Sequence, residues 1–226
     1  MRELLRGFLD LLLPLLCATC GEPCDATVPL CARCSASLPW LARGDDCATP
    51  KGLDACFAAV AFSGETLTWI HRFKYPRPGL RGLDPAAAAV ALWLAERAAE
   101  LAPAERVDLV VPVPLHPRRL RERGFNPAGL LARRIARARR ARFDPVALER
   151  IRDTPSQTAL DRAQRRRNVL GAFRADPRGR IPARVWLVDD VVTTGSTLTA
   201  AATALRRAGA RHVTGICVAR TARPGG

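Results

Sequence analysis

The sequence predicts an α/β protein in which a mainly parallel sheet is flanked by helices and preceded by a small cysteine-rich segment. Short apolar runs, typical of buried strands, alternate with stretches of helical periodicity. A polar loop joins one of these strands directly to a helix, and six of the eight cysteines fall within the first 50 residues. With 226 residues, 48% hydrophobic and 25% charged, the chain can bury a core. A wholly disordered chain, a collagen-like fibre and a disulfide-stapled miniprotein are excluded.

The charge of the chain is unevenly distributed. Lys and Arg number 36 against 21 Asp and Glu, a formal net charge of +15. Residues 1–106 carry 11 basic and 12 acidic side chains, a net −1, whereas residues 107–226 carry 25 and 9, a net +16. The cationic second half indicates a partner that carries phosphate, including nucleic acid. The alternative is that an Ala/Arg-rich composition reflects the base composition of the genome, with many arginines on a solvated face.

Residues 1–16 resemble a signal peptide but lack its parts. Arg2 and Arg6 precede an apolar run that Asp10 interrupts, and the stretch at 11–16 is much shorter than the roughly 20 apolar residues that cross a bilayer. No small-residue cleavage site follows before Cys17. Leucines at helical spacing predict instead a short amphipathic helix on a cytoplasmic protein with no transmembrane segment. Peripheral membrane contact is the alternative.

Four of the N-terminal cysteines form two pairs with metal-ligand spacing, Cys17-x2-Cys20 and Cys31-x2-Cys34. A two-residue gap lets both thiolates of a tight turn face one ion, and two such turns complete a tetrahedron around zinc. The first 50 residues contain few large apolar side chains, so metal binding would supply much of the folding free energy of this segment. The predicted zinc is therefore structural.

The remaining cysteines are ambiguous or buried. Cys24 or Cys47 could replace one of the four ligands, and the spacing does not choose between them. A redox or packing role is the alternative to zinc, although disulfides seldom persist in a cytosolic protein. Cys56 and Cys217 lie in apolar stretches and are predicted to be small buried hydrophobes. We expect two parts: a helix and zinc-ribbon-like segment over residues 1–52, and the α/β domain over residues 53–226.

Apolar periodicity assigns the elements of the α/β domain. The continuous apolar runs at 109–113 and 185–188 are typical of parallel strands buried on both faces. The predicted elements are, in order, a strand at 55–62, a short helix around 71–76, a helix at 85–102, a strand at 109–113, a helix from about 124 to 141, a strand at 185–188, a helix at 196–208 and a last strand that begins at 212.

The most informative stretch is the strand, loop and helix that begin at residue 185. Asp189 and Asp190 follow the apolar strand, at the end where they can accept hydrogen bonds from the vicinal hydroxyls of a sugar. The next residues place hydroxyls and backbone N–H groups at a helix N-terminus, which suits a phosphate. They are Thr193, Thr194, Gly195, Ser196 and Thr197. A diol site beside a phosphate site predicts a ribose 5-phosphate as ligand.

This stretch resembles the phosphoribosyl pyrophosphate (PRPP) signature of type I phosphoribosyltransferases: four apolar residues, two acids, two apolar residues and a Thr/Gly/Ser loop. The resemblance implies that Asp189 and Asp190 hold the ribose 2- and 3-hydroxyls and that residues 193–197 hold the 5-phosphate. It also implies a Mg²⁺ ion that bridges the hydroxyls and the pyrophosphate. In these enzymes pyrophosphate leaves an oxocarbenium-like ribosyl centre, so the protein mainly positions the groups and neutralises charge.

Two cationic blocks precede this loop. In phosphoribosyltransferases the loop after an early strand holds pyrophosphate, and residues 108–126 match that position. Residues 154–173 lie where a mobile loop closes over the active site in related enzymes. The candidates for these contacts are His116, Arg118, Arg119, Lys74, Arg162, Arg166 and Arg167, with Gln157 and Asn168 in the second block. The alternatives are a solvated Arg-rich helix and polar surface residues.

Several segments together resemble the ComF family over nearly the whole chain. Besides the cysteine pairs they are HRFKYP at 71–76, PVPLHPRRLRERGFN at 112–126, TPSQTAL at 154–160, RRRN at 165–168 and VDDVVTTGST at 188–197. That family joins a zinc-ribbon-like segment to a phosphoribosyltransferase-type domain and is associated with natural competence, the uptake of DNA for transformation. Many members carry a second pair of cysteine knuckles; here that region offers only Cys47 and Cys56, so one zinc is expected.

The resemblance implies a cytoplasmic, PRPP-binding protein that transfers ribose 5-phosphate, but it does not identify the acceptor. The alternative, from another class, is a PRPP-sensing or single-stranded-DNA-handling adaptor that keeps the fold for binding. Trp, Tyr and Phe total 12 and most lie outside the basic stretches, which argues against a base-stacking groove but permits phosphate contacts.

Overall fold

The computed structural model describes residues 16–24, 28–42, 49–75, 83–103, 105–153, 171–177 and 179–221. Several predicted features lie outside these ranges. They are the predicted N-terminal helix, of which only Leu16 is described, and the residues Cys47, Arg162, Arg166 and Arg167. Among the described residues, no helix combines the length and the apolar character that a membrane crossing requires.

The strands of the central sheet are all parallel and follow the order β1-β7-β6-β2-β3. They are β1 (Ala55–Ala61), β2 (Leu109–Pro112), β3 (Arg142–Phe143), β6 (Arg184–Val192) and β7 (His212–Arg220). The chain leaves β2 toward β3 on one side and returns to β6 on the other. The carboxyl ends of β2 and β6 therefore flank the switch point, where open α/β sheets bind ligands.

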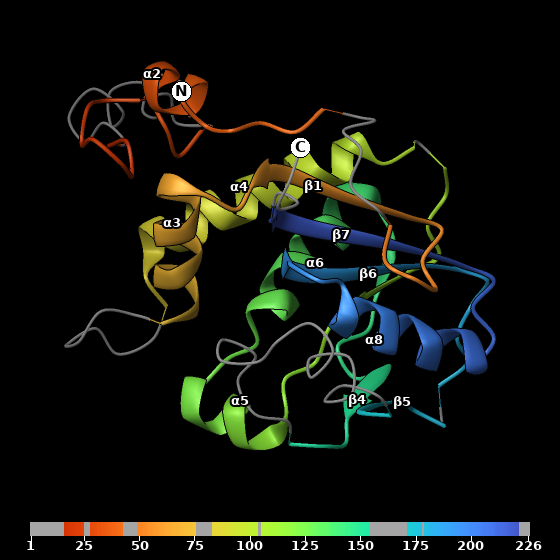
Figure 1. The fold of residues 1–226 in the computed structure, drawn as a ribbon. Coiled ribbons are helices and arrows are strands. Elements are labelled where there is room, and N and C mark those ends of the chain that lie inside the picture. Colours follow the sequence, from red (N-terminus) through yellow and green to blue (C-terminus); the bar gives the residue numbers. More distant parts are fainter. Residues whose placement is uncertain are drawn as a thin grey trace, which may run out of the picture.

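Helices cover both faces of this sheet (Figure 1). One layer holds α3 (Gly64–Lys74), α4 (Pro85–Leu101) and α6 (Pro127–Arg139). The other holds α8 (Ser196–Arg207) beside the antiparallel pair β4 (Leu148–Arg150) and β5 (Phe173–Ala175). Neighbouring residues of β6 point to opposite faces of the sheet: Trp186 packs against the first layer and Leu187 against the second. The predicted fold class, a mainly parallel sheet flanked by helices, is confirmed.

Several elements differ from their predicted bounds. The short helix expected around 71–76 is the end of α3, which already begins at Gly64 and stops at Lys74. β6 continues through the two aspartates to Val192, because Val191 and Val192 still pair with β7. The turn expected after β2 contains a helix, α5 (Pro117–Arg123), which has proline in its first turn and ends at Gly124 with φ +82°. The helix predicted from about 124 therefore begins only at Pro127.

The cysteine-rich segment packs directly on the α/β core. Leu30 and Leu38, which flank the short helix α2 (Ala32–Ala36), belong to the same apolar cluster as residues of α3 and α4, and Figure 1 shows α2 next to these helices. Trp40 forms an antiparallel bridge with Val60, so the chain here extends the outer edge of β1. The division of the chain after residue 52 stays a prediction.

A buried ion pair fixes α3 against α4. Asp84 is 3% exposed, and its Oδ2 accepts a hydrogen bond of 3.0 Å from Nε of Arg72. Its Oδ1 accepts from the N–H of Ala87 at 3.1 Å and so caps α4. Burial opposes the charge of this carboxylate, but these donors outweigh burial and hold its pKa below the ordinary value. Because α3 ends at Lys74, the pair also sets where Lys74 lies.

Replacing Asp84 with Ala should lower the free energy of unfolding by about 3 kcal/mol at pH 7, because it removes the cap of α4 and leaves Arg72 without its partner. Asp84→Asn keeps an oxygen for the cap and should lose less. Since the folded-state pKa is depressed, the contribution is present above the unfolded pKa of about 4 and is lost as pH falls through the folded-state value.

Urea unfolding at pH 7 and at pH 3 checks this expectation. The gap between wild type and Asp84→Ala should be largest at pH 7 and should narrow at pH 3. Equal stability of the two proteins at pH 7 would contradict it.

Candidate functional site

The candidate site lies beyond the carboxyl ends of β2 and β6. A cavity of about 490 Å³ opens there, within the size range of ligand pockets. It is lined by α3, the turn after β2, the start of α6, the end of β4 and the stretch from Asp189 to Leu198. The structure thus gathers the predicted acidic pair and the hydroxyl-rich loop around one space.

The acidic pair is in contact with a lysine. Asp190 is 7% exposed, and Nζ of Lys74 lies 2.9 Å from its Oδ1. The backbone N–H of Asp190 donates a hydrogen bond of 2.9 Å to Oδ1 of Asp189. Burial by itself lowers the pKa of the Lys74 ammonium, but the charges of Asp190 and Asp189 outweigh burial and raise it overall. Lys74 is therefore a permanent cation in the cavity.

Asp189 has a pKa well above the ordinary value of an aspartate. Burial and the neighbouring charge of Asp190 raise its pKa to about 7, against smaller opposing effects of Lys74 and of the Asp190 N–H. A carboxyl group with a raised pKa in a cavity is a common mark of a functional site, because a bound cation or hydroxyl donor would stabilise its charge.

The loop between β6 and α8 has the donors of a phosphate site. Gly195 precedes α8 with φ +71°, a conformation that favours glycine, and it has no side chain to cap the first turn. A Cβ at this position would lie 2.6 Å from Cγ of Pro50, so the chain around residue 50 presses on the loop. The Oγ atoms of Thr194 and Ser196 lie 2.9 Å apart. Hydroxyls and first-turn N–H groups together can bind an anion.

The other predicted residues divide between the cavity and its surroundings. Arg119 lines the cavity with the acidic pair. Arg118 and His116 lie outside it: the Arg118 side chain is 67% exposed, with Nη1 3.5 Å from Oδ2 of Asp153, and Nδ1 of His116 lies 3.6 Å from Oδ1 of the same carboxylate. The roles of these residues stay predictions.

Sequence reasoning did not single out Arg150, which lines the cavity from β4. Burial and the nearby Arg119 lower the pKa of its guanidinium, while Asp189 acts in the opposite direction. Arg123 also lines the cavity, with its guanidinium carbon 4.7 Å from the centre of the Tyr75 ring. Arg123 falls within the predicted pyrophosphate block at 108–126, whereas the only signal for Arg150 in the sequence is the excess of arginine itself.

The second candidate site is a cluster of four thiols. The Sγ atoms of Cys17, Cys20, Cys31 and Cys34 all lie within 4.8 Å of one another. Burial opposes ionisation of Cys17, but backbone N–H donors outweigh it and lower its pKa to about 6. Burial and the neighbouring sulfurs raise the pKa of Cys34 to about 12. Four thiolates this close require a cation, and four sulfur donors suit zinc, so the cluster can hold a structural zinc ion.

The cluster is the predicted quartet, and Cys24 is not part of it. Sγ of Cys24 lies 3.5 Å from the carbonyl oxygen of Val28, to which it donates. Cys47 lies outside the described residues. Cys217 is 1% exposed, as predicted for a buried hydrophobe, whereas Cys56 is half-buried.

A parallel sheet with an acidic pair and a hydroxyl-rich loop at its carboxyl edge defines an open α/β protein with a candidate ligand site at its switch point. It is joined to an N-terminal segment whose four cysteines could hold a zinc ion. No family model matches the chain. Its curated relatives are nevertheless similar over most of their length, and the chain belongs to the ComF family, which includes proteins named DNA utilization protein YhgH and competence protein F.

Three relatives show the extent of the similarity. DNA utilization protein YhgH of Escherichia coli O157:H7 is 34% identical over 213 residues, which cover 91% of this chain and 84% of the relative. The protein of that name from Salmonella typhimurium is 32% identical, with 91% and 90% covered. Competence protein F of Haemophilus influenzae is 30% identical, with 92% and 91% covered.

Solved structures align with part of the chain. A glutamine PRPP amidotransferase from B. subtilis, complexed with ADP and GMP, covers 65% of this chain at 23% identity with a TM-score of 0.44. An allosteric regulatory enzyme of purine biosynthesis covers 66% at 22% identity with a TM-score of 0.42. The chain spans only 30% of the length of each of these two proteins.

Metal analysis of variants tests the thiol cluster. Wild-type protein purified without chelator should contain about one zinc per chain, and Cys20→Ser should contain almost none, because a serine hydroxyl does not supply a thiolate ligand. Cys24→Ser is the matched control and should keep its zinc. Plasma mass spectrometry gives the stoichiometry, and thermal unfolding should show a lower Tm for Cys20→Ser alone, since metal binding contributes to folding.

Two results would contradict this assignment. One is wild-type protein that holds no zinc; the other is loss of zinc from Cys24→Ser to the same extent as from Cys20→Ser.

Proposed function

We propose that this protein binds PRPP with Mg²⁺ in the cavity beyond β2 and β6 and transfers its ribose 5-phosphate to an acceptor, releasing pyrophosphate. One observation carries the proposal: Asp189, Asp190 and the loop at 193–197 line the same cavity. Vicinal hydroxyls require neighbouring acceptors and a phosphate requires N–H and O–H donors, and both sets are available there.

Each group of residues has a role in this proposal. The acidic pair would accept hydrogen bonds from the ribose 2- and 3-hydroxyls, and the loop at 193–197 would donate to the 5-phosphate. Carboxylate oxygens also fit Mg²⁺, which would neutralise charge on the pyrophosphate when bound. The side chains of Arg119, Arg123 and Arg150, which line the cavity, would bind the pyrophosphate oxygens.

The reaction would break one bond and form one. The bond from ribose C1 to the pyrophosphate oxygen breaks, and pyrophosphate leaves with the electron pair. A lone pair of the acceptor forms the new bond to C1, and the acceptor gives up a proton. Positive charge develops on the ribose ring and negative charge on the leaving group, so fixed carboxylates and guanidinium groups on the two sides would lower the barrier.

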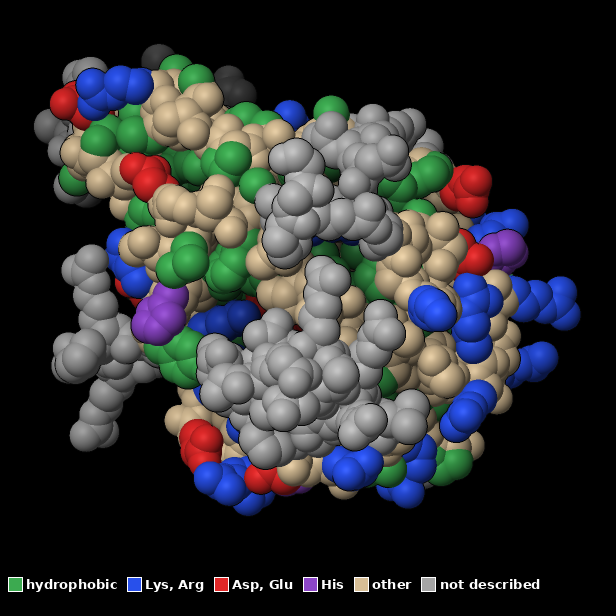
Figure 2. All heavy atoms as spheres, viewed as in Figure 1, with side chains coloured by type: hydrophobic (Ala, Val, Ile, Leu, Met, Phe, Trp, Pro, Cys, Tyr) green, Lys and Arg blue, Asp and Glu red, His purple; other side chains and the backbone are tan. Residues whose placement is uncertain are grey.

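A part in DNA uptake is proposed alongside this activity, in the cytoplasm. The relatives carry names that refer to DNA utilization and competence. Figure 2 shows Lys and Arg side chains along the right-hand and lower edges of one face. This basic surface favours a second candidate function, a PRPP-sensing or single-stranded-DNA-handling adaptor, because cationic surfaces bind the phosphate backbone.

Calorimetry with PRPP and Mg²⁺ tests the proposal. Wild-type protein should bind, and Asp190→Asn should weaken binding at least about tenfold, because a hydrogen bond to a charged acceptor contributes about 1.5–3 kcal/mol. Asp144→Asn is the matched control: this aspartate follows β3, caps its own turn at Val146 and does not line the cavity. No PRPP binding by the wild type, or equal affinity of Asp190→Asn, would overturn the proposal.

A pyrophosphate-release screen over bases, amines and nucleic-acid acceptors separates the two candidate functions. Release that depends on Asp190 supports the transferase. PRPP binding without release for any acceptor, together with DNA affinity that falls steeply with salt, supports the adaptor.

A further inference from the structure

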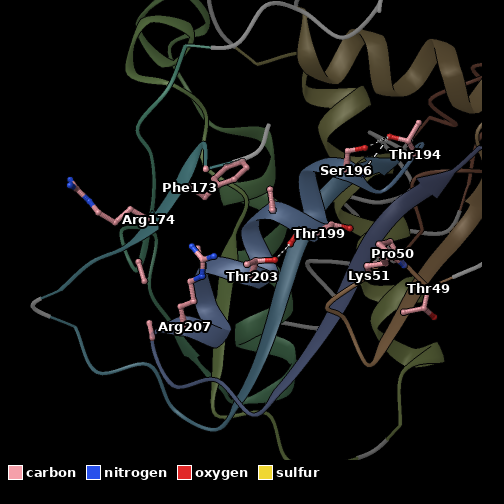
Figure 3. Close-up of a pocket in the computed structure, with 15 residues that line it drawn as sticks. Thr49, Pro50, Lys51, Phe173, Arg174, Thr194, Ser196, Thr199, Thr203 and Arg207 are labelled. Carbon is pink, nitrogen blue, oxygen red and sulfur yellow. Dashed lines mark hydrogen bonds between the residues drawn. The ribbon is translucent and has the colours of Figure 1, made fainter. Parts of the chain in front are cut away.

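A second, larger cavity lies on the outer side of α8. Its volume is about 920 Å³, and it is bounded by residues 49–51, by β5 and by one face of α8. Figure 3 shows Pro50 and Lys51 on one side of α8, and Phe173 and Arg174 on the other. The cavity is thus a trough with the helix as its floor.

The charged side chains among the described lining residues of this trough are all positive. Lys51, Arg174 and Arg207 line it, and no acidic side chain is among its described lining residues. Nη2 of Arg174 lies 3.1 Å from Oε2 of Glu149, which is not among the lining residues of the trough. Within the described ranges of the chain, Lys51 and Arg207 form no ion pair and both are exposed. Two cations of the trough are therefore available to an anionic ligand.

The rest of the lining is mostly apolar and small. Pro50, Phe173, Ala200 and Ala204 contribute hydrocarbon surface, and Thr199 and Thr203 lie one helical turn apart on the floor. The Oγ1 atom of Thr203 donates to the carbonyl oxygen of Thr199 at 2.7 Å. Apolar walls with cations at the margins suit a molecule with a flat uncharged body and a phosphate group.

The trough shares a wall with the candidate PRPP site. Thr194 and Ser196 line both cavities, and their hydroxyl oxygens lie 2.9 Å apart. Pro50, also in the trough, presses on Gly195 between them. Each hydroxyl has one hydrogen to donate, so a hydrogen bond given to a ligand on one side is withdrawn from the other.

We propose that the trough is a second binding site for a free organic phosphate of nucleotide size, and that its occupancy weakens ligand binding at the loop on the other side of Thr194 and Ser196. The site itself stands on the trough's own lining. The coupling rests on the proposed PRPP function.

Deoxythymidine monophosphate is the probe, because it carries a phosphate and a base but lacks the vicinal diol that the acidic pair would bind. Calorimetry with wild-type protein should detect binding. Arg207→Glu and Lys51→Glu, which alter two separate elements, should each weaken binding at least about tenfold. Arg133→Glu is the matched control on the exposed surface of α6, and Asp190→Asn reports on the other cavity; both should bind as the wild type does.

Titration of the probe in the presence of PRPP measures the coupling. The affinity for the probe should fall about fivefold or more and then reach a plateau at saturating PRPP, as two linked sites require. If the affinity for the probe keeps falling as more PRPP is added, the two ligands share one site, and this result would overturn the proposal. So would an absence of probe binding by the wild type, or unchanged affinity in both charge-reversal variants.

Two further outcomes are distinguishable. Probe binding that depends on Arg207 in a protein that does not bind PRPP would uphold the trough while the proposed function fails. Binding of a ten-residue oligothymidylate through Arg207 and Lys51, without binding of the mononucleotide, would overturn the free phosphate in favour of a strand of DNA.

Discussion

Two consecutive carboxylates near the end of a buried strand repel each other, and the positive charge of Lys74, with Nζ 2.9 Å from Oδ1 of Asp190, offsets this repulsion. The other features of the site are arranged around this ion pair. The pKa of Asp189 is about 7. Lys74 is the last residue of α3, so α3 has to end close to the carboxyl ends of the strands. The buried pair of Arg72 with Asp84 holds α3 in place for that purpose. The ion pair of Arg72 with Asp84 in the helical layer thereby supports the ion pair of Lys74 with Asp190 at the ends of the strands.

The N-terminal part of the chain supports this arrangement by packing against α3, α4 and the loop before α8. The cysteine segment shares the apolar core of α3 and α4, so a metal ion there would stabilise the helical layer that carries Lys74. Further along, Pro50 contacts the position where a Cβ of Gly195 would lie, and the oxygen of Gly52 accepts from Arg206 of α8 at 2.7 Å. The loop at 193–197 is therefore packed between the sheet and the chain that leads out of the cysteine-rich segment.

The features that depend on local sequence patterns were predictable, and those that depend on contacts between distant parts of the chain were not. The strand β6, the helix α8 and the acidic pair near the end of that strand were predictable because apolar runs and helical spacing are local patterns. The cysteine quartet was predictable because ligand spacing is also local. Arg150 was not, because β4 is three residues long and is held by pairing with β5, far along the chain. Arg118 and Arg119 are adjacent and look equivalent as sequence, and only the turn of α5 shows that Arg119 alone lines the cavity.

The most direct test of this electrostatic arrangement is the pKa of Asp189, read from the carboxyl ¹³C chemical shift between pH 4 and pH 9 and assigned by comparison with Asp189→Asn. The free protein should show a value near 7. Saturating PRPP with Mg²⁺ should lower it, because hydroxyl donors and a cation favour the ionised form. A value near the ordinary 4 in the free protein, or a raised value that the ligand leaves unchanged, would contradict the proposed role of the acidic pair.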